Sequence, residues 1–247
     1  MNVLDHGYVN LVESWGSDER IIEAARMSTD KGFQGWGPIH KGICSAIGGP
    51  IPCHICGTTQ QGDEKLLSYL WNNKHHTPFE MAGFTIEIQA PIFVVREWHR
   101  HRTQSYNELS GRYTTLPDLY YIPSVERLMA GKQATKNKQS SEAGFTEQQA
   151  RDLRGDFIYA TEQSRKMYEL MLERGVSREL SRLVIPVNQY TRFRASANLR
   201  NWLGFLALRC EPSAQWEIRQ YAEEVAKIVK QLHPRTYKLS VESKRAT

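Results

Sequence analysis

The segment from Thr146 to Gly175 most constrains the fold, because its apolar side chains recur with the period of an α-helix. Thr146 and Gln149 form a capping-box pattern that predicts where the helix begins, and Gly175 predicts where it ends. The residues expected along the apolar face are Ala150, Leu153, Phe157, Ala160, Ser164, Met167, Tyr168 and Met171. The chain is therefore expected to contain one long amphipathic helix among shorter elements.

The shorter segments indicate both strands and helices. Residues 84–88 alternate apolar and polar side chains as a half-buried strand does, and a second strand is expected at 190–195. Further helices are expected at 18–27, 64–73, 92–101, 177–184, 213–232 and behind Asn198, with a polar loop at 103–113. Because these elements follow no regular βαβ order, the sequence predicts an α+β fold, with helices packed around a small, mostly antiparallel sheet.

The composition is that of an ordinary folded chain. Its 247 residues are enough for one domain over 1–247 that buries a core without disulfides. Apolar residues make up 40% and charged residues 24%, which excludes a disordered chain. The net charge of +5 suits small anionic ligands. With no signal-peptide pattern, and Glu87 and Gln89 interrupting the most apolar stretch, we expect a cytoplasmic protein without a membrane span.

Residues 31–63 form a glycine- and proline-rich insert that holds three of the four cysteines. A His-x3-Cys pair followed by Cys-x2-Cys-Gly has the residue types and turn of a zinc knuckle. The candidate ligands are Cys44, Cys53, Cys56 and His40, with His54 as an alternative to His40. In a reducing compartment such a cluster indicates a metal or free thiols before disulfides, so a loop with free thiols is the alternative interpretation.

Most of the chemically active side chains lie in residues 96–113, with the sequence REWHRHRTQSYNELSGRY. Apolar residues 92–95, just upstream, predict a helix anchored in the core whose polar end reaches a cleft. Arginine guanidinium groups bind phosphate oxygens in pairs and keep their charge, while Asn, Glu and Ser side chains can recognise the polar edge of a heterocycle. The segment therefore predicts a site for a nucleotide or flavin phosphate that carries a polar ring.

Two other interpretations of residues 96–113 stay open on spacing alone. Most mixed charge runs are solvated, salt-bridged surfaces, and clustered arginines also favour RNA or DNA binding. The modest net charge and the lack of interleaved aromatic side chains argue against nucleic acid as a partner. Residues 35–38 lack the strand–helix setting of a phosphate-binding turn, so a flavin has to be held by side chains and by contacts between subunits.

Arg100-His101-Arg102, followed after seven residues by Ser110, resembles the signature of the flavin-dependent thymidylate synthases. Further segments resemble that family in the same order, and they are Arg26-Met27-Ser28, residues 75–80, 90–94, 178–182 with Pro186, 190–193, 198–200, and Leu208-Arg209 with residues 214–217. The resemblance covers nearly the whole chain outside the insert and residues 131–144.

The resemblance implies a homotetramer that holds FAD at subunit boundaries and makes dTMP from dUMP, with methylenetetrahydrofolate as carbon donor and NADPH as reductant. A nucleotide-binding flavoprotein without methylation activity is the alternative. The residues implied for dUMP are Glu97, Trp98, His99, Arg100, Glu108, Leu109, Ser110, Gly111, Arg112, Arg182 and Arg209. Those implied for FAD are His75, Thr77, Glu80, Arg100, His101, Arg102, Asn107, Glu108, Asn198, Leu199 and Arg200.

The resemblance assigns Arg209 the catalytic role of activating the uracil ring. A fixed guanidinium near N3 and O4 would stabilise the negative charge that develops there, and a reduced flavin supplies the hydride that completes the methyl group. Ser110 has no evident His–Asp pair to activate it, so we expect it to hold the nucleotide phosphate. Gly204 departs from the family pattern, in which Asn often precedes Phe205, and this puts one flavin contact in question.

Overall fold

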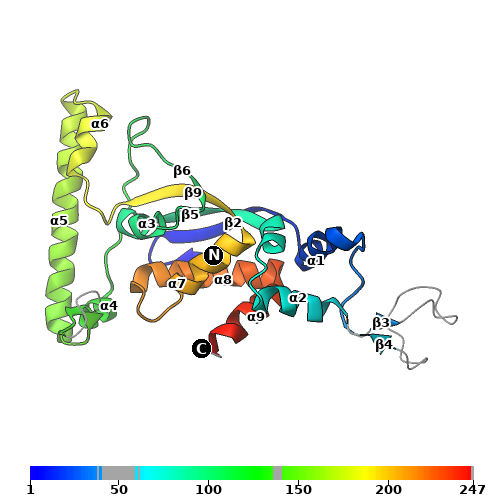
Figure 1. Ribbon diagram of the computed structural model, residues 1–247. Coiled ribbons are helices and arrows are strands. Elements are labelled where there is room, and N and C mark those ends of the chain that lie inside the picture. The colour runs from blue at the N-terminus through cyan, green and yellow to red at the C-terminus, as the bar shows by residue number, and fades with distance from the viewer. Residues whose placement is uncertain (38, 41–58, 61, 136–140, 246–247) are drawn as a thin grey trace. The chain divides into compact units, whose positions relative to one another are not determined.

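The computed structural model of the chain describes residues 1–37, 39–40, 59–60, 62–135 and 141–245 (Figure 1). Over these residues the architecture is α+β, as predicted. The α-helices are α1 Asp18–Arg26, α2 Asp63–Asn72, α3 Ile92–Trp98, α4 Val125–Met129, α5 Glu147–Glu173, α6 Arg178–Ser181, α7 Leu199–Arg209, α8 Trp216–Leu232 and α9 Pro234–Arg245. Short 3-10 helices are η1 Met27–Thr29, η2 Thr77–Met81 and η3 Arg182–Val184. Within the described ranges, no helix is long and apolar enough to cross a bilayer.

The principal sheet is antiparallel and has the strand order β1-β2-β5-β9-β6. Its strands are β1 Asn2–Val3, β2 Gly7–Trp15, β5 Gly83–Pro91, β6 Ser105–Glu108 and β9 Tyr190–Asn198. Two small hairpin pairs are β3 Ile39–His40 with β4 Thr59–Gln60, and β7 Lys132–Gln133 with β8 Ser141–Glu142. The expected small, mostly antiparallel sheet is confirmed.

The chain divides into two compact units, each assembled from separated stretches of sequence. Unit 1 comprises Met1–Asn10, Ile86–Ala195 and Ala207–Glu224, and unit 2 comprises Leu11–Thr85, Ser196–Leu206 and Val225–Thr247. Strands β2, β5 and β9 each contribute residues to both units. The single domain expected over 1–247 stays a prediction.

The core of unit 1 fixes α3, the helix that leads into the arginine–histidine segment. Trp98, the last residue of α3, is fully buried, and its ring centroid lies 5.5 Å from that of Phe193 on β9 and 6.3 Å from that of Tyr221 on α8. Val94 and Val95 are also buried, as the apolar run predicts. Such aromatic packing makes the end of α3 rigid, so the following residues leave from a fixed point.

The polar loop expected at 103–113 is partly wrong, because Ser105–Glu108 form the edge strand β6. Beyond the strand, the backbone N–H of Leu109 donates to the carbonyl of Arg192, the residue in β9, at 2.8 Å. The four residues of β6 contain no aliphatic side chain, so no apolar alternation announces the strand. Pairing with β9 decides the local structure here, and no periodicity in the sequence reports it.

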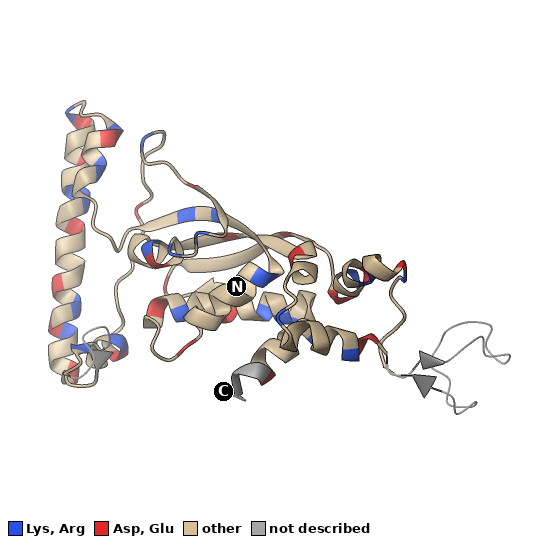
Figure 2. Ribbon diagram, in the orientation of Figure 1, with Lys and Arg blue, Asp and Glu red and all other residues tan. Residues whose placement is uncertain are grey.

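Helix α5 begins and ends where the sequence predicts. Both hydrogen bonds of the capping box between Thr146 and Gln149 are present, and Gly175 has a φ of 80° beyond the helix. The expected burial of its apolar face is wrong in part, because Phe157 and Met167 keep 43% and 44% of their surface exposed. Within unit 1 the helix contacts α4 and α6 near its two ends (Figure 1), and charges of both signs are spread along it (Figure 2).

Unit 2 has its own aromatic core and a C-terminal helix that the sequence analysis missed. The rings of Phe84 and Trp202 stack at 4.7 Å, and the indole N–H of Trp202 donates to the carbonyl of Phe84 at 3.0 Å. Helix α9 is held by buried Asp18 in α1, whose carboxylate accepts the hydroxyl of Thr236 at 2.7 Å and the N–H of Arg235 at 2.8 Å. These contacts connect residues more than two hundred positions apart.

The two ends of the insert are held together at the start of α2. Buried Asp63 accepts backbone N–H groups from Gln34 at 2.7 Å and Gly35 at 3.2 Å, and its own N–H donates to the carbonyl of Gly35 at 2.9 Å. Glu64 accepts the N–H of Gly37 at 2.5 Å. We call this group of contacts the insert base. A buried carboxylate that accepts several backbone N–H groups holds two segments of the chain together stably.

Candidate active site

Arg209, at the end of α7, is the centre of a polar cluster within unit 1. Its Nη1 donates to the Glu97 carboxylate at 2.9 Å, its Nη2 to the Glu97 carbonyl at 3.2 Å, and its Nε to His101 Nε2 at 2.9 Å. The Arg209 side chain is only 17% exposed, whereas that of Glu97 is 44% exposed. The guanidinium is therefore fixed in direction while part of the cluster stays open to solvent.

His101 is neutral in this cluster. Burial and the neighbouring positive charge of Arg209 lower its pKa to about 4, although Glu97 acts in the opposite direction. Because Nε2 accepts the Arg209 N–H, the ring must carry its proton on Nδ1 at neutral pH. The expectation from the resemblance was a flavin contact for His101, and the structure places this ring against the predicted catalytic arginine.

The loop after β6 approaches a second predicted arginine. A Cβ on Gly111 would lie 3.4 Å from Cδ of Arg182, an ordinary contact distance, so the loop passes beside this side chain. Arg112 lies 3.5 Å from the carboxylate of Glu179, one turn before Arg182. The Ser110 hydroxyl accepts the backbone N–H of Arg112 at 3.3 Å. Arg112 and Arg182 thus both lie near this loop, and their binding of the dUMP phosphate together with Ser110 stays a prediction.

An open pocket of about 350 Å³ lies beside this loop in unit 1. It is lined by Glu87, Asn107, Glu108, Leu109, Arg192, Phe193 and Arg194. The sequence analysis predicted three of these as site residues but missed Arg192 and Arg194. A usable signal was present, because polar and buried residues alternate along β9 and place both arginines on its exposed face.

The predicted site residues of this segment differ in whether their side chains are accessible to a ligand. Trp98 is fully buried in the core, and His99 packs its ring 4.6 Å from Tyr106. Arg100 is exposed, as is Arg102 on the flavin set. Glu108 accepts the hydroxyl of Thr191 at 2.8 Å. Trp98 and His99 therefore support the shape of the segment, while the exposed arginines remain accessible.

Other residues predicted for the flavin lie in unit 2. His75 and Thr77 line a pocket of about 450 Å³ between α1, the end of α2 and η2. The lining residues are Ala24, Ala25, Leu70, Lys74, His75, His76, Thr77, Pro78 and Met81, and no carboxylate is among them. Basic and hydroxyl groups beside apolar side chains can bind a pyrophosphate and a flat ring, both of which a flavin dinucleotide contains.

The start of α7 completes the predicted flavin residues of unit 2. Arg200 forms an ion pair with Glu80 at 2.5 Å, and the side chain of Asn198 accepts the N–H of Asn201 at 3.0 Å, which caps the helix. Leu199 is buried, and its N–H donates to the Ala82 carbonyl. Space around Gly204 is open, so a larger side chain there meets no steric obstacle.

The predicted zinc ligands Cys44, Cys53 and Cys56 fall outside the described residues, as does the side chain of His40. Over the part of the chain that the structure describes, no group of three metal-binding side chains could hold an ion. Zinc in the insert stays a prediction.

A solved structure resembles this chain in fold. A solved structure titled a UMP/dUMP methylase, PolB from Streptomyces cacaoi bound with 5-Br dUMP, matches with a TM-score of 0.78 and 27% identity, covering 98% of this chain and 97% of that one. The chain thus has the α+β fold of a nucleotide methylase.

Sequence comparison gives the family. The family model described as "Thymidylate synthase complementing protein" matches residues 10–235. A flavin-dependent thymidylate synthase from Thermus thermophilus is 40% identical over 232 residues, covering 94% of this chain and 74% of that protein. One from Thermosipho melanesiensis is 38% identical over 236 residues, covering 95% and 90%. This chain belongs to the flavin-dependent thymidylate synthase family.

Proposed function

We propose that this protein is an enzyme that methylates dUMP to dTMP by a flavin-dependent reaction. The observation that carries the proposal is the fixed guanidinium of Arg209, held by Glu97 and His101 at the position where the family resemblance places the group that activates uracil. Family membership and the likeness to a UMP/dUMP methylase support the same substrate.

Arg209 supplies electrostatic stabilisation at the uracil ring. Three of its five N–H donors contact Glu97 and His101, which leaves two donors for a ligand. A guanidinium already oriented by protein contacts needs no reorganisation when negative charge develops on the ring oxygen, so C5 becomes a better nucleophile. Ser110, Arg112 and Arg182 bind the phosphate and fix the distance between the ring and Arg209.

We assign to FAD the unit 2 residues His75, Thr77, Glu80, Asn198 and Arg200 and, in unit 1, Arg100, Arg102, Asn107 and Glu108. When bound, the reduced flavin supplies the hydride that no amino-acid side chain can provide. The Glu80–Arg200 pair orients a guanidinium at the start of α7, and the cap made by Asn198 fixes that helix end. The role of these residues is thus to bind and orient the cofactor.

Methylenetetrahydrofolate is the carbon donor and NADPH the reductant in this proposal. A one-carbon unit transferred at the methylene level needs two further electrons to become a methyl group, so a separate reductant is required. NADPH provides these electrons, and the folate leaves as tetrahydrofolate, which balances the reaction. We place the enzyme in the cytoplasm as a homotetramer with FAD at subunit boundaries and no nucleic-acid partner. The exposed apolar side chains of α5 support the assembly.

The test combines cofactor, reductant and product. Purified protein should be yellow, its flavin absorbance should bleach with NADPH, and bleaching should be faster with dUMP. Arg209→Ala should fold and bind FAD while dTMP formation falls about 100- to 1000-fold, the usual effect of removing one group that stabilises developing charge. Chromatographic detection of dTMP measures the loss, and FAD titration is the control. Turnover at the wild-type rate by Arg209→Ala would remove the proposed role.

UMP is a second candidate substrate. The related PolB structures are titled as a UMP/dUMP methylase and contain 5-Br dUMP or 5-Br UMP. Supplying UMP in place of dUMP, under the same conditions, shows whether this chain accepts a ribose 2′-hydroxyl.

A further inference from the structure

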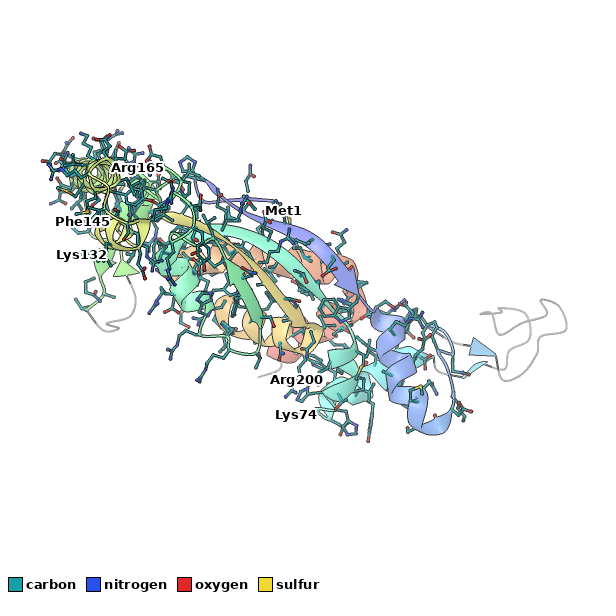
Figure 3. The ribbon with its side chains drawn as sticks, turned by 90° about the horizontal axis from the view of Figure 1, so that it is seen from above. Met1, Lys74, Lys132, Phe145, Arg165 and Arg200 are labelled. Carbon is teal, nitrogen blue, oxygen red and sulfur yellow. The ribbon has the colours of Figure 1, made fainter. Side chains whose placement is uncertain are left out.

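Lys74 has a backbone conformation that side chains other than glycine rarely adopt. Its φ is +57°, in the left-handed region, and it follows the last turn of α2 (labelled in Figure 3). The N–H of Lys74 donates to the Trp71 carbonyl at 3.1 Å, and the N–H of His75 donates to the Leu70 carbonyl at 2.9 Å. These two bonds define a Schellman motif, in which glycine is the usual residue at this position.

The same motif at the end of α5 shows the difference. There Gly175 has a φ of +80°, its N–H donates to the Leu172 carbonyl at 3.0 Å, and the N–H of Val176 donates to the Met171 carbonyl at 3.0 Å. One helix therefore ends with the residue that the geometry favours, and the other ends with a lysine under backbone strain. Strain of this kind persists where the side chain has a use.

A favourable interaction with the helix dipole does not account for the lysine. A cation gains that interaction anywhere in the last turn of a helix, where the backbone is relaxed. In α2 the last turn holds no basic residue, and the positive charge stands two residues past Asn72, the last residue of the helix, at the strained position. We therefore look for a role of the Lys74 charge in the pocket next to the end of α2.

The pocket of about 450 Å³ described above lies at this point. Lys74 lines it together with His75, His76 and Thr77. No carboxylate is among the lining residues, so none of them offers an ion-pair partner to the Lys74 ammonium. Such a lining attracts an anion, and a hydroxyl with several N–H donors suits phosphate oxygens.

We propose that Lys74 binds a phosphate group of a dinucleotide in this pocket, and that the left-handed backbone conformation is retained because it directs the ammonium group toward that phosphate. The inference rests on the proposed function, since the pocket includes residues assigned to FAD. FAD and NADPH share the pyrophosphate that this lysine recognises, so both are tested.

The experiment compares three variants of the full-length protein after removal of bound cofactor. Lys74→Gly removes the charge and relieves the backbone, Lys74→Gln removes the charge only, and Lys74→Arg keeps it. FAD affinity, followed by flavin fluorescence, should fall about tenfold in Lys74→Gly and Lys74→Gln, as expected for a lost charge-assisted hydrogen bond, and change little in Lys74→Arg. Lys74→Gly should also melt a few degrees higher than the wild type without cofactor.

A gain in thermal stability combined with a loss of affinity is a result that a purely structural lysine cannot produce. Unchanged affinity for both FAD and NADPH in Lys74→Gln would overturn the proposal, as would loss of stability and affinity together in Lys74→Gly. If NADPH affinity alone falls, the lysine binds the phosphate of the reductant. Failure of the wild type to bind FAD would instead contradict the proposed function.

Discussion

Arg209 and His101 show both the reach and the limit of the sequence at the scale of single residues. The resemblance selects both residues, but it assigns them to different ligands, and no local spacing connects positions 108 residues apart. Their hydrogen bond arises from tertiary packing, which brings the end of α7 against the residues that follow α3. The sequence names both residues as candidates, whereas their pairing could not be predicted from it.

The neutral state of His101 leads to a prediction about pH. Its pKa of about 4 in the folded protein lies below the ordinary value of 6.5, so between these values the unfolded chain binds a proton that the folded chain does not. Stability should therefore fall as the pH drops from 6.5 toward 4. NMR titration of the histidine ring measures the folded pKa directly.

The matched variant for this prediction is His101→Gln, whose amide oxygen can accept from Arg209 but cannot titrate. Chemical denaturation at pH 7 and pH 5 should show a smaller loss of stability for the variant than for the wild type. His233 also has a pKa lowered by burial, so only the difference between the two proteins isolates His101. Equal losses would show that His101 is not the titrating group.

At the scale of elements, the sequence predicts best where local chemistry determines the structure. The boundaries of α5 follow from Thr146, Gln149 and Gly175, each of which acts through its own backbone neighbourhood. Strand β6 was missed because its formation depends on β9, far along the chain. The pocket arginines Arg192 and Arg194 were missed for a related reason, since their alternation identifies an exposed face but not its purpose.

The cap of α5 gives a prediction of its own. Thr146→Ala removes the hydroxyl that accepts the N–H of Gln149 and should cost about 1 kcal/mol of unfolding free energy. For a chain of this size the melting temperature should fall by about 2–4 °C. Ser177 is the control, because it precedes α6 without capping it through its side chain, so Ser177→Ala should have little effect. Similar losses in both variants would contradict the capping role.

At the scale of the whole molecule, the exposed apolar residues on α5 are where we expect subunits to meet. Phe157, Tyr159 and Met167 are all exposed on this helix. The sequence period predicted Phe157 and Met167, but not Tyr159, as part of the apolar face. It could not predict what covers them, because periodicity cannot distinguish a core within the chain from an interface between chains.

The expected homotetramer has a mass of about 114 kDa, four times the 28.5 kDa of the chain. Light scattering coupled to size-exclusion chromatography should show this mass. Phe157→Glu places a charge on the apolar face and should shift the population to smaller species without unfolding the helix. Gln163→Glu adds the same charge at an exposed polar position of α5 and should leave the assembly intact. A tetramer unaffected by Phe157→Glu would place the interface elsewhere.

The insert base has a consequence for how this chain tolerates changes in length. The backbone N–H groups of Gln34, Gly35 and Gly37 donate to the carboxylates of Asp63 and Glu64, so the two sides of the insert are joined at this point. Because the entropy of closing a loop grows only slowly with its length, we expect that replacing the segment between them by one of different length has little thermodynamic effect on the rest of unit 2. The junction is thus a suitable point at which to graft a foreign sequence.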